Sequence, residues 1–402
     1  MVIQGKGSHM LHVEESVKFE EQFTDAFLKF RPRLKEMYQD EKLHPISPEV
    51  WELMANLGWF GCVVPTEYGG NERGLSAMAS AAEAITKSGV TPVFAVLTAL
   101  SAVCIARFGS ESLKQKYLPE IAKGAIKFAF AATEERAGFN MLEIDTFARK
   151  DGDHYVINGA KMYISGFDLA DNILLVARTM TLKQCKEMNL PKTAGISLFV
   201  VGTDQAGITK HRLNTRGEGY IKQFALSFEN VRISAQQLLG KEHEGASALF
   251  TSFNVERVLF VAFALGSIQY CLDIACDYAR TRRVFGDNPI GKYQSIQHPL
   301  ADAKIRSEAV RQLLLQAVDM IEQGGDPAKV STMINSAKYL VSEAGSKALD
   351  ASMDALGGRA FNEDYGIIQL AETMRLLRLS PISNSLILND IAERVLCLPR
   401  SY

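Results

Sequence analysis

Several features that define other protein classes are scarce or missing in this sequence. Its 402 residues include six cysteines without a CxxC pair, so we expect neither a disulfide scaffold nor an oxidising compartment. The formal net charge of -2 gives no reason to expect nucleic acid or an anionic membrane as a partner. The uncharged stretch at residues 258–272 is shorter than the roughly 20 apolar residues that span a bilayer, so it predicts a buried helix.

The motifs of several enzyme classes are missing as well. The sequence has no HExxH or HxxxH pattern and no cysteine cluster, so we expect no metal site. Without a GxSxG, P-loop or GxGxxG motif, it supports neither a serine hydrolase nor a Rossmann dinucleotide site. Residues 1–10 end in Gly-Ser-His-Met and look like an expression scar. The residues after them show neither a signal peptide nor a transit peptide, so we expect a cytoplasmic protein.

What is present is a helical pattern at both ends of the chain and a β pattern between them. From Phe128 onward, short β-type runs are separated by turn signals at residues 151–153 and 158–159. After Gly245, long helical patterns follow one another with glycine breaks between them. Near the N-terminus, apolar residues recur at roughly helical spacing, namely Val17, Phe19, Phe23, Phe27, Leu28 and Met37. We therefore predict a mainly α protein with an N-terminal helical domain (11–127), a small antiparallel β domain that could close into a barrel (128–243), and a C-terminal helical bundle (244–402).

Two segments of the predicted β domain could lie close to a ligand. Residues 128–138 combine small side chains with backbone amides, which suits the close approach of a flat ring or a phosphate. In residues 158–166, Asn158-Gly159 predicts a two-residue hairpin that places Tyr163 and Ser165 on one face of the following strand. The residues alone leave ordinary alternatives open, a strand entering a turn for the first segment and core packing for the second.

Two segments of the C-terminal domain carry charges that could serve chemistry. Glu256 and Arg257 are the only charged residues between positions 255 and 272, and burial would raise the pKa of the Glu256 carboxyl toward that of a general base. The alternative is an acid in the first turn of a helix, where the helix dipole favours it. At residues 279–286, arginines beside Phe285 could clamp a diphosphate and stack on an adenine. They could equally form the solvated basic end of a helix.

Taken in order, these segments resemble the acyl-CoA dehydrogenase family across the chain after Met10. The resemblance implies a helical domain, a β domain and a four-helix bundle. It also implies an FAD-dependent oxidoreductase that converts an acyl-CoA thioester into the trans-2-enoyl-CoA, with a carboxylate taking the α-proton and flavin N5 taking the hydride. The matching motifs are Val64-Pro65-Thr66-Glu67-Tyr68-Gly69-Gly70, Thr133-Glu134, residues 152–161, Glu256-Arg257, Arg282-Arg283-Val284-Phe285-Gly286 with Gln294, and Gly357-Gly358 with Tyr365 and Arg375.

The resemblance also implies where the cofactor and the partners bind. It places one group of residues at the flavin ring, with Phe130, Ala132 and Thr133 against it and Tyr163 and Ser165 flanking it near N5. It places a second group at the adenosine-diphosphate end of FAD, across a dimer interface: Arg282, Phe285, Gln294 and Gly358. A site built in this way implies a homotetramer, arranged as a dimer of dimers. The expected electron acceptor is electron-transfer flavoprotein.

The catalytic base is where the sequence departs from most of the family. Most members carry the base in a Tyr-Glu-Gly-Thr loop, and the matching residues here are 383–386, with Asn384 in the place of the glutamate. An amide cannot take a proton. A minority of members, including isovaleryl-CoA and long-chain enzymes, takes the base from the bundle helix, at the position that matches Glu256. The resemblance therefore makes Glu256 the base, with Asn254 and Arg257 binding the CoA or acyl part of the substrate.

Further departures keep other activities open. Glu135 and Gly138-Phe139-Asn140 replace the usual residues of the first flavin loop, and Asp354 replaces a glutamine before the Gly-Gly turn. One alternative is a non-catalytic or hetero-oligomeric subunit of the same fold, which Asn384 favours. Another is an oxygen-using member of the superfamily, such as an oxidase or a monooxygenase.

Overall fold

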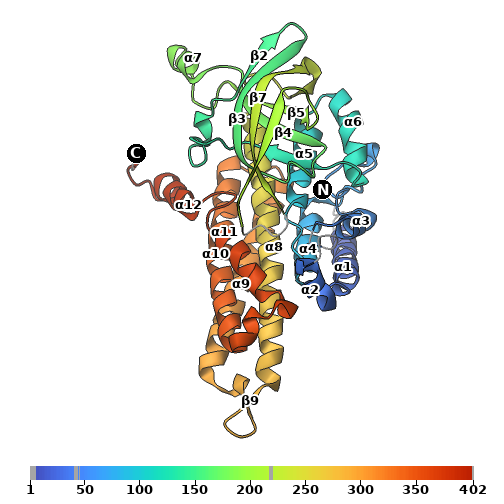
Figure 1. The fold of residues 1–402 in the computed structure, drawn as a ribbon, viewed down its shortest axis with the longest axis vertical. Helices are drawn as coiled ribbons and strands as arrows, with labels where there is room; N and C mark the ends of the chain where they lie inside the picture. Colours follow the sequence, from blue (N-terminus) through green and yellow to red (C-terminus); the bar gives the residue numbers. More distant parts are fainter. Residues whose placement is uncertain (1–5, 40–43, 45, 217–220, 401–402) are drawn as a thin grey trace. The chain divides into compact units, whose positions relative to one another are not determined.

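The computed structural model describes residues 6–39, 44, 46–216 and 221–400, with residues 6–16, 38 and 39 described by their backbone. The predicted order of helices, β strands and helices is confirmed (Figure 1). Residues 1–5 of the predicted expression scar lie outside the described residues, whereas residues 6–10 belong to the first helix. The chain packs into two compact units. The first comprises Met1–Ser47, Arg73–Pro92 and Arg257–Tyr402, and the second comprises Pro48–Glu72 and Val93–Glu256.

The helices of the N-terminal third are shared between the two units. On α1, three phenylalanines are buried because they recur every four residues and share one face: Phe19, Phe23 and Phe27. Val17 and Leu28 were predicted to join this stripe, but they lie off that face and are exposed. The predicted domain boundary after residue 127 stays a prediction, because the two compact units divide these helices between them and do not follow that boundary. The first unit takes α1 (Lys6–Leu28), α2 (Leu34–Gln39) and α4 (Gly74–Thr86), and the second takes α3 (Pro48–Asn56), α5 (Ala95–Phe108) and α6 (Glu111–Ala122).

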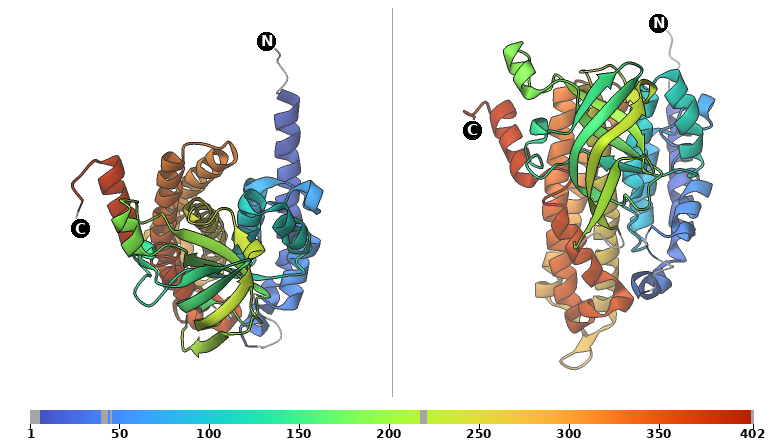
Figure 2. Two further views of the ribbon diagram at one scale, coloured as in Figure 1. Left: turned by 90° about the horizontal axis from the view of Figure 1, so that it is seen from above. Right: turned by 45° about the horizontal axis from the view of Figure 1, so that its top comes forward.

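The second unit is built around a sheet that has eight strands among the described residues. The strand order is β6-β7-β3-β2-β4-β5-β8, with β1 paired beside β4, and the long strands β3 and β7 run side by side in Figure 2. The antiparallel prediction holds for most of the sheet, but β1 and β2 lie parallel to β4. In the described part of the chain the end strands β6 and β8 do not pair, so the sheet stays open. Its strands are β1 (Phe128–Ala131), β2 (Phe147–Asp151), β3 (His154–Ser165), β4 (Asn172–Arg178), β5 (Ile196–Gly202), β6 (Ile208–Leu213), β7 (Gln223–Ser234) and β8 (Leu238–Leu239).

The predicted hairpin at Asn158-Gly159 is wrong. Strand β3 runs straight through these residues, and its register against β7 shifts between Ile157 and Gly159. The Asn158 side chain fixes this irregularity by accepting a 2.9 Å hydrogen bond from the backbone N–H of Asn230 on β7. Gly159 is needed for a different reason than a turn, because a Cβ there would lie 2.6 Å from the Cα of Thr146. The turn that joins β2 to β3 lies at residues 152–153, as predicted.

The first unit is built around long helices, and α9 (Gln294–Glu322) and α10 (Pro327–Leu356) run side by side (Figure 1). Helix α8 (Ala246–Thr281) belongs to both units, and α11 (Ile367–Leu376) and α12 (Asn384–Asp390) follow α10. A short hairpin of β9 (Arg283–Val284) and β10 (Asn288–Pro289) connects α8 to α9. Among the described helices, α8 is long and apolar enough to cross a membrane, but 78% of its apolar window is buried. It is therefore the buried core helix that its sequence predicts.

Candidate active site

The residues predicted to meet the flavin ring lie in the second unit, where β1 ends beside the end of β3. The Thr133 hydroxyl donates to the backbone carbonyl of Met162, and the Met162 N–H donates to the Thr133 carbonyl over 2.9 Å. Ala132 is buried, and the ring of Phe130 meets that of Phe253 edge to face at 6.1 Å. The structure therefore brings Phe130, Ala132 and Thr133 to the stretch of β3 that carries Tyr163 and Ser165.

Tyr163 lies in a β-bulge and not in the regular strand that was predicted to carry it. Lys161 pairs with Leu226 and Ile164 pairs with Phe224, so two residues of β3 lie opposite one residue of β7. The φ angle of Tyr163 is +59°, and the residue is 63% exposed. Positive φ is uncommon for residues other than glycine and is an outlier for a bulky side chain.

Ser165, two residues beyond Tyr163, is held by a neighbouring amide. Its hydroxyl lies 3.2 Å from Gln223 Oε1 and 2.9 Å from Gln223 Nε2, so it can donate to the first and accept from the second. Tyr163 thus projects from the sheet while Ser165 is fixed against β7. Such a pair can place a ring and a hydroxyl beside a flat ligand.

A buried ion pair is formed by Lys161, which comes directly before the two residues of the bulge, and Glu134. The ammonium of Lys161 is fully hidden and lies 2.8 Å from Glu134 Oε1 and 2.8 Å from the Ala132 carbonyl oxygen. Burial alone would raise the pKa of the Glu134 carboxyl. The Lys161 charge and the hydrogen bonds from Asp145 and Thr146 outweigh it and hold that pKa below its usual value. Burial lowers the pKa of Lys161, and Glu134 opposes this shift.

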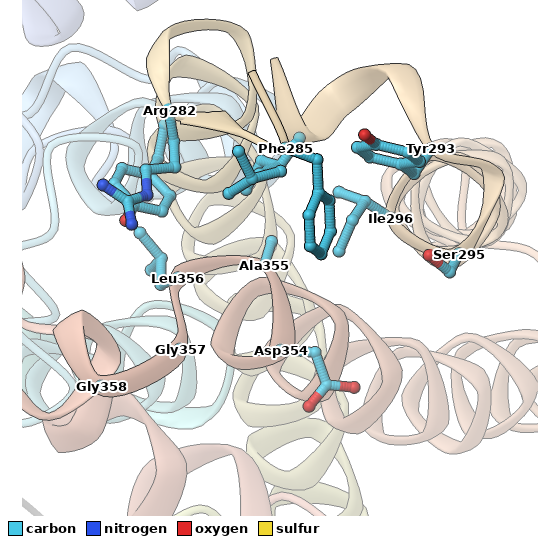
Figure 3. A pocket seen from close by; sticks show the side chains of 13 residues that line it. Arg282, Phe285, Tyr293, Ser295, Ile296, Asp354, Ala355, Leu356, Gly357 and Gly358 are labelled. Carbon is cyan, nitrogen blue, oxygen red and sulfur yellow. The ribbon is translucent and has the colours of Figure 1, made fainter. Parts of the chain in front are cut away.

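A pocket of about 540 Å³ lies in the first unit, at the junction of α8, the β9–β10 hairpin and the end of α10. Figure 3 shows Arg282 and Phe285 on the wall that follows α8, with Asp354 and the Gly357-Gly358 turn on the facing wall. Phe285 has a φ of +47°, and the residue is 88% exposed. Of the four residues predicted for the adenosine-diphosphate end, three therefore share one pocket.

Gln294, the fourth of these residues, is not among those that line the pocket. It is the exposed first residue of α9, and the pocket takes Tyr293, Ser295 and Ile296 from the same segment. The structure therefore does not place Gln294 in this pocket with the other three residues.

The pocket residues fit the adenosine-diphosphate half of a dinucleotide. Arg282 supplies a guanidinium for phosphate oxygens, and Phe285 and Tyr293 supply faces for an adenine. A Cβ added at Gly357 or Gly358 would meet nothing within 4 Å, so a ligand can approach the backbone there. The exception is Asp354, whose carboxylate would repel a phosphate.

Glu256 lies well inside α8, about three turns beyond the helix start at Ala246. The alternative of a first-turn acid held by the helix dipole is therefore wrong. Its side chain is buried, with 9% of the residue exposed, as expected for an acid beside an apolar run. Asn254 and Arg257 are three residues apart and share one face of α8, whereas Glu256 points about 200° around the helix from Asn254. The spacing separates the acid from the two candidate binding residues.

Asn384 is fully engaged by its neighbours. It is the first residue of α12, and its Oδ1 accepts a 3.1 Å hydrogen bond from the ammonium of Lys338. Its Nδ2 donates to Ser342 Oγ over 2.8 Å and to Glu343 Oε1 over 3.2 Å. Lys338 is buried, and burial together with the charge of Arg257 lowers the pKa of its ammonium to about 8. Asn384 thus joins a buried cation to an acid, which requires both halves of an amide.

The chain matches known proteins over nearly its whole length. Three models match in order, described as the N-terminal (14–125), middle (129–231) and C-terminal (243–396) domains of acyl-CoA dehydrogenase. Acyl-CoA dehydrogenase FadE12 of Mycobacterium tuberculosis is 35% identical over 369 residues, which cover 91% of this chain and 93% of that protein. The structure of butyryl-CoA dehydrogenase from Megasphaera elsdenii aligns with a TM-score of 0.82 at 25% identity, covering 93% of this chain and 98% of that one. The fold is also shared with PigA bound to FAD and proline, with a TM-score of 0.83 at 23% identity over 98% and 99% of the two chains.

The family matches and the fold define the class as FAD-dependent oxidoreductases. Within that class, the chain belongs to the acyl-CoA dehydrogenase family. The roles of Thr133, Tyr163, Ser165, Arg282 and Phe285 in binding FAD stay predictions from the sequence motifs.

Sequence reasoning missed two sets of polar residues. Glu134 and Lys161 belong to motifs that served only to identify the family resemblance. The feature that could have indicated the pair is a lysine at a buried position of a strand. The Lys338–Asn384 bond joins residues far apart in the sequence, so it carries no local signal.

Proposed function

We propose that this enzyme catalyses α,β-dehydrogenation of an acyl-CoA thioester to the trans-2-enoyl-CoA, with Glu256 as the base. The observation that carries the proposal is the contrast between two positions. Asn384 replaces the usual glutamate and is bonded to Lys338, Ser342 and Glu343, so it offers no proton acceptor. Glu256 is a buried carboxylate on α8, at the position from which a minority of the family takes its base.

The residues of this chain divide the chemistry between them. Glu256 takes the α-proton, and its burial excludes the water that would otherwise solvate the carboxylate. Arg257 and Asn254, on another face of α8, bind the CoA or acyl part of the substrate. FAD supplies a hydride acceptor when it is bound. Positioned hydrogen-bond donors polarise the thioester carbonyl as enolate charge develops.

Two parts of the proposal concern partners. Electron-transfer flavoprotein is the proposed electron acceptor. The proposed assembly is a homotetramer in which a neighbouring subunit reaches the adenosine-diphosphate end of FAD. The exposure of Phe285 supports this assembly, because an aromatic residue that is 88% exposed beside a pocket is a surface that a ligand or a second copy would cover. The cytoplasmic location stays a prediction.

The test of the base is anaerobic mixing of Glu256→Gln with a panel of short, branched, long and steroid-type acyl-CoA esters. The isosteric amide should keep FAD and acyl-CoA binding and should slow flavin bleaching by about 10²–10⁴-fold, the usual contribution of a general base. Glu120→Gln is the matched control, since Glu120 is a surface acid paired with Lys123. Bleaching at the wild-type rate in Glu256→Gln would end the assignment.

Asn384 also favours a second candidate, a non-catalytic subunit of a hetero-oligomer. The purified chain distinguishes the two. A yellow homo-oligomer that is bleached by an acyl-CoA excludes the second candidate, and a chain that is bleached only after a partner is added supports it. The oxygen-using alternative predicts that the reduced enzyme reoxidises rapidly in air, whereas a dehydrogenase reoxidises slowly.

A further inference from the structure

The backbone of Tyr163 is held in a conformation that its own side chain does not stabilise. Its φ of +59° lies in the left-handed region, which a residue with a bulky side chain rarely occupies. The residue is 63% exposed, so burial in the core does not compensate for this conformation. A strained conformation persists only where its surroundings fix it, and such places concentrate at functional sites.

The residues immediately before Tyr163 are fixed by the segment that follows β1. The Lys161 ammonium bonds to the Ala132 carbonyl and to Glu134 Oε1, both over 2.8 Å. Met162 bonds through both of its backbone groups to Thr133. Two consecutive residues of β3 are therefore tied to three consecutive residues after β1. Tyr163 is then the residue of the bulge that projects from the sheet.

Glu134 is itself fixed from a third segment. Its Oε2 accepts a 2.6 Å hydrogen bond from the Asp145 N–H, and its Oε1 accepts a 3.0 Å bond from the Thr146 N–H. Only 10% of the Glu134 side chain and none of the Lys161 side chain is exposed. A buried ion pair is often no more stabilising than apolar residues of similar volume, but it is directional. Here the pair ties Lys161, the residue before Met162 and Tyr163, to the segment that follows β1.

We propose that the buried Glu134–Lys161 ion pair is a positioning element that holds the Met162–Tyr163 bulge so that the Tyr163 ring lies against the flavin. This inference rests on the proposed function, in which Tyr163 flanks the flavin ring. Neither member of the pair needs to touch the cofactor. Both act through the backbone of residues 162 and 163.

The experiment compares Lys161→Met, Glu134→Gln and the double variant as FAD-bound proteins. Three quantities are measured: the visible spectrum of bound oxidised FAD, the dissociation constant for FAD, and the rate constant of flavin reduction by an acyl-CoA. The double variant guards against misfolding of the single variants, because two neutral side chains leave no unpaired buried charge. Phe199→Leu is the matched control. It loosens the packing of Phe199 on Tyr155 in the same sheet without touching the bulge.

We expect all three variants of the pair to shift the spectrum and to slow reduction by about 10–100-fold, the scale of a displacement near 1 Å. The double variant should regain thermal stability without regaining the wild-type spectrum. Phe199→Leu should lose stability and keep both the spectrum and the rate. In a Tyr163→Gly background, Lys161→Met should change the spectrum and the rate no further, because the ring is already gone.

Folded variants of the pair with the wild-type spectrum and rate would overturn the positioning role, as would an equal effect of Phe199→Leu. Failure of the proposed reaction gives a different result. Wild-type protein that no acyl-CoA bleaches refutes that reaction, while the spectrum and affinity of oxidised FAD still decide the role of the pair. Wild-type protein that takes up no FAD would overturn both.

Discussion

The two regions assigned to the cofactor are built in opposite ways. In the sheet region, Thr133, Glu134 and Lys161 are buried or half-buried. Lys161 pairs with Glu134, and Thr133 donates a hydrogen bond to the residue that follows Lys161. In the pocket beyond α8, Arg282 and Phe285 are exposed on a short hairpin. A reacting ring needs a fixed frame, whereas the remote end of a cofactor needs only affinity, which a ligand or a second subunit can complete on binding. The sheet region should therefore respond to mutation through stability and geometry, and the pocket through affinity alone.

The largest effect is expected from breaking the ion pair in the sheet region. Glu134→Gln leaves the Lys161 ammonium buried without its counter-charge, which should lower the free energy of unfolding by about 3–5 kcal/mol. Asp151→Asn is the control, since its ion pair with Arg232 lies on the same sheet but is exposed and should contribute about 0–1 kcal/mol. Urea unfolding of the FAD-free proteins measures both. Equal losses of unfolding free energy in the two variants would mean that the buried pair contributes no more to stability than the exposed one.

The next effect is expected in the pocket, on affinity. Arg282→Ala should weaken FAD binding by about 10–100-fold, since a hydrogen bond between charged groups contributes about 1.5–3 kcal/mol. Unfolding of the FAD-free protein should not change. Arg280→Ala is the control, because that exposed arginine pairs with Asp277 one turn away on α8. Titration with FAD measures the effect, and a loss of intrinsic stability in Arg282→Ala would contradict the comparison.

A smaller effect of opposite sign is expected at Asp354. Removing its charge in Asp354→Asn should tighten FAD binding by an amount of about 0.3–1 kcal/mol, because the pocket is open to solvent that screens the repulsion. The gain should shrink as salt is added. Asp350→Asn, an exposed acid one turn earlier on α10, should change nothing. Weaker binding in Asp354→Asn would mean that the carboxylate accepts hydrogen bonds from the ligand.

The last prediction concerns how the stability that the Glu134–Lys161 pair contributes depends on pH. This dependence is negligible at neutral pH and appears in acid. The pKa of Glu134 is lower in the folded chain than its usual value of 4.5, so its contribution to stability is complete above that value. The contribution is lost as the pH falls through the folded-state pKa, because protonation then favours the unfolded chain. Urea unfolding at decreasing pH should therefore show wild type and Glu134→Gln converging. A difference that stays constant in acid would exclude titration of Glu134.

Most of the fold could be predicted from the sequence because its elements obey simple periods. The stripe of Phe19, Phe23 and Phe27 follows the helical repeat, and the turn at residues 152–153 carries its own glycine. Strand β6 could not be found in this way. It is an edge strand whose Thr209, Lys210, His211 and Arg212 are exposed, so it lacks an apolar alternation.

The membership of the candidate site stays a prediction from the motifs, and the local structure around Tyr163 could not be predicted from the sequence. Asn158-Gly159 has the composition of a hairpin, yet tertiary contacts with Asn230 and Thr146 turn it into an irregularity within β3. The bulge at Tyr163 depends in the same way on residues about 30 positions earlier in the chain. Local sequence preferences cannot predict hydrogen bonds between such distant residues. The grouping of Arg282, Phe285 and Gly358 could be predicted, because these residues belong to motifs at the ends of helices.

Helix α8 has a consequence for how this chain can change in evolution. Arg257, in its interior, and Thr281, at its end, are joined by uninterrupted helix of about 36 Å at 1.5 Å per residue. Inserting or deleting one residue between them would turn one end by about 100° relative to the other and shift it by 1.5 Å. We therefore expect this stretch to tolerate point substitutions but not insertions or deletions. In relatives that share the chemistry, we expect insertions and deletions to fall outside it.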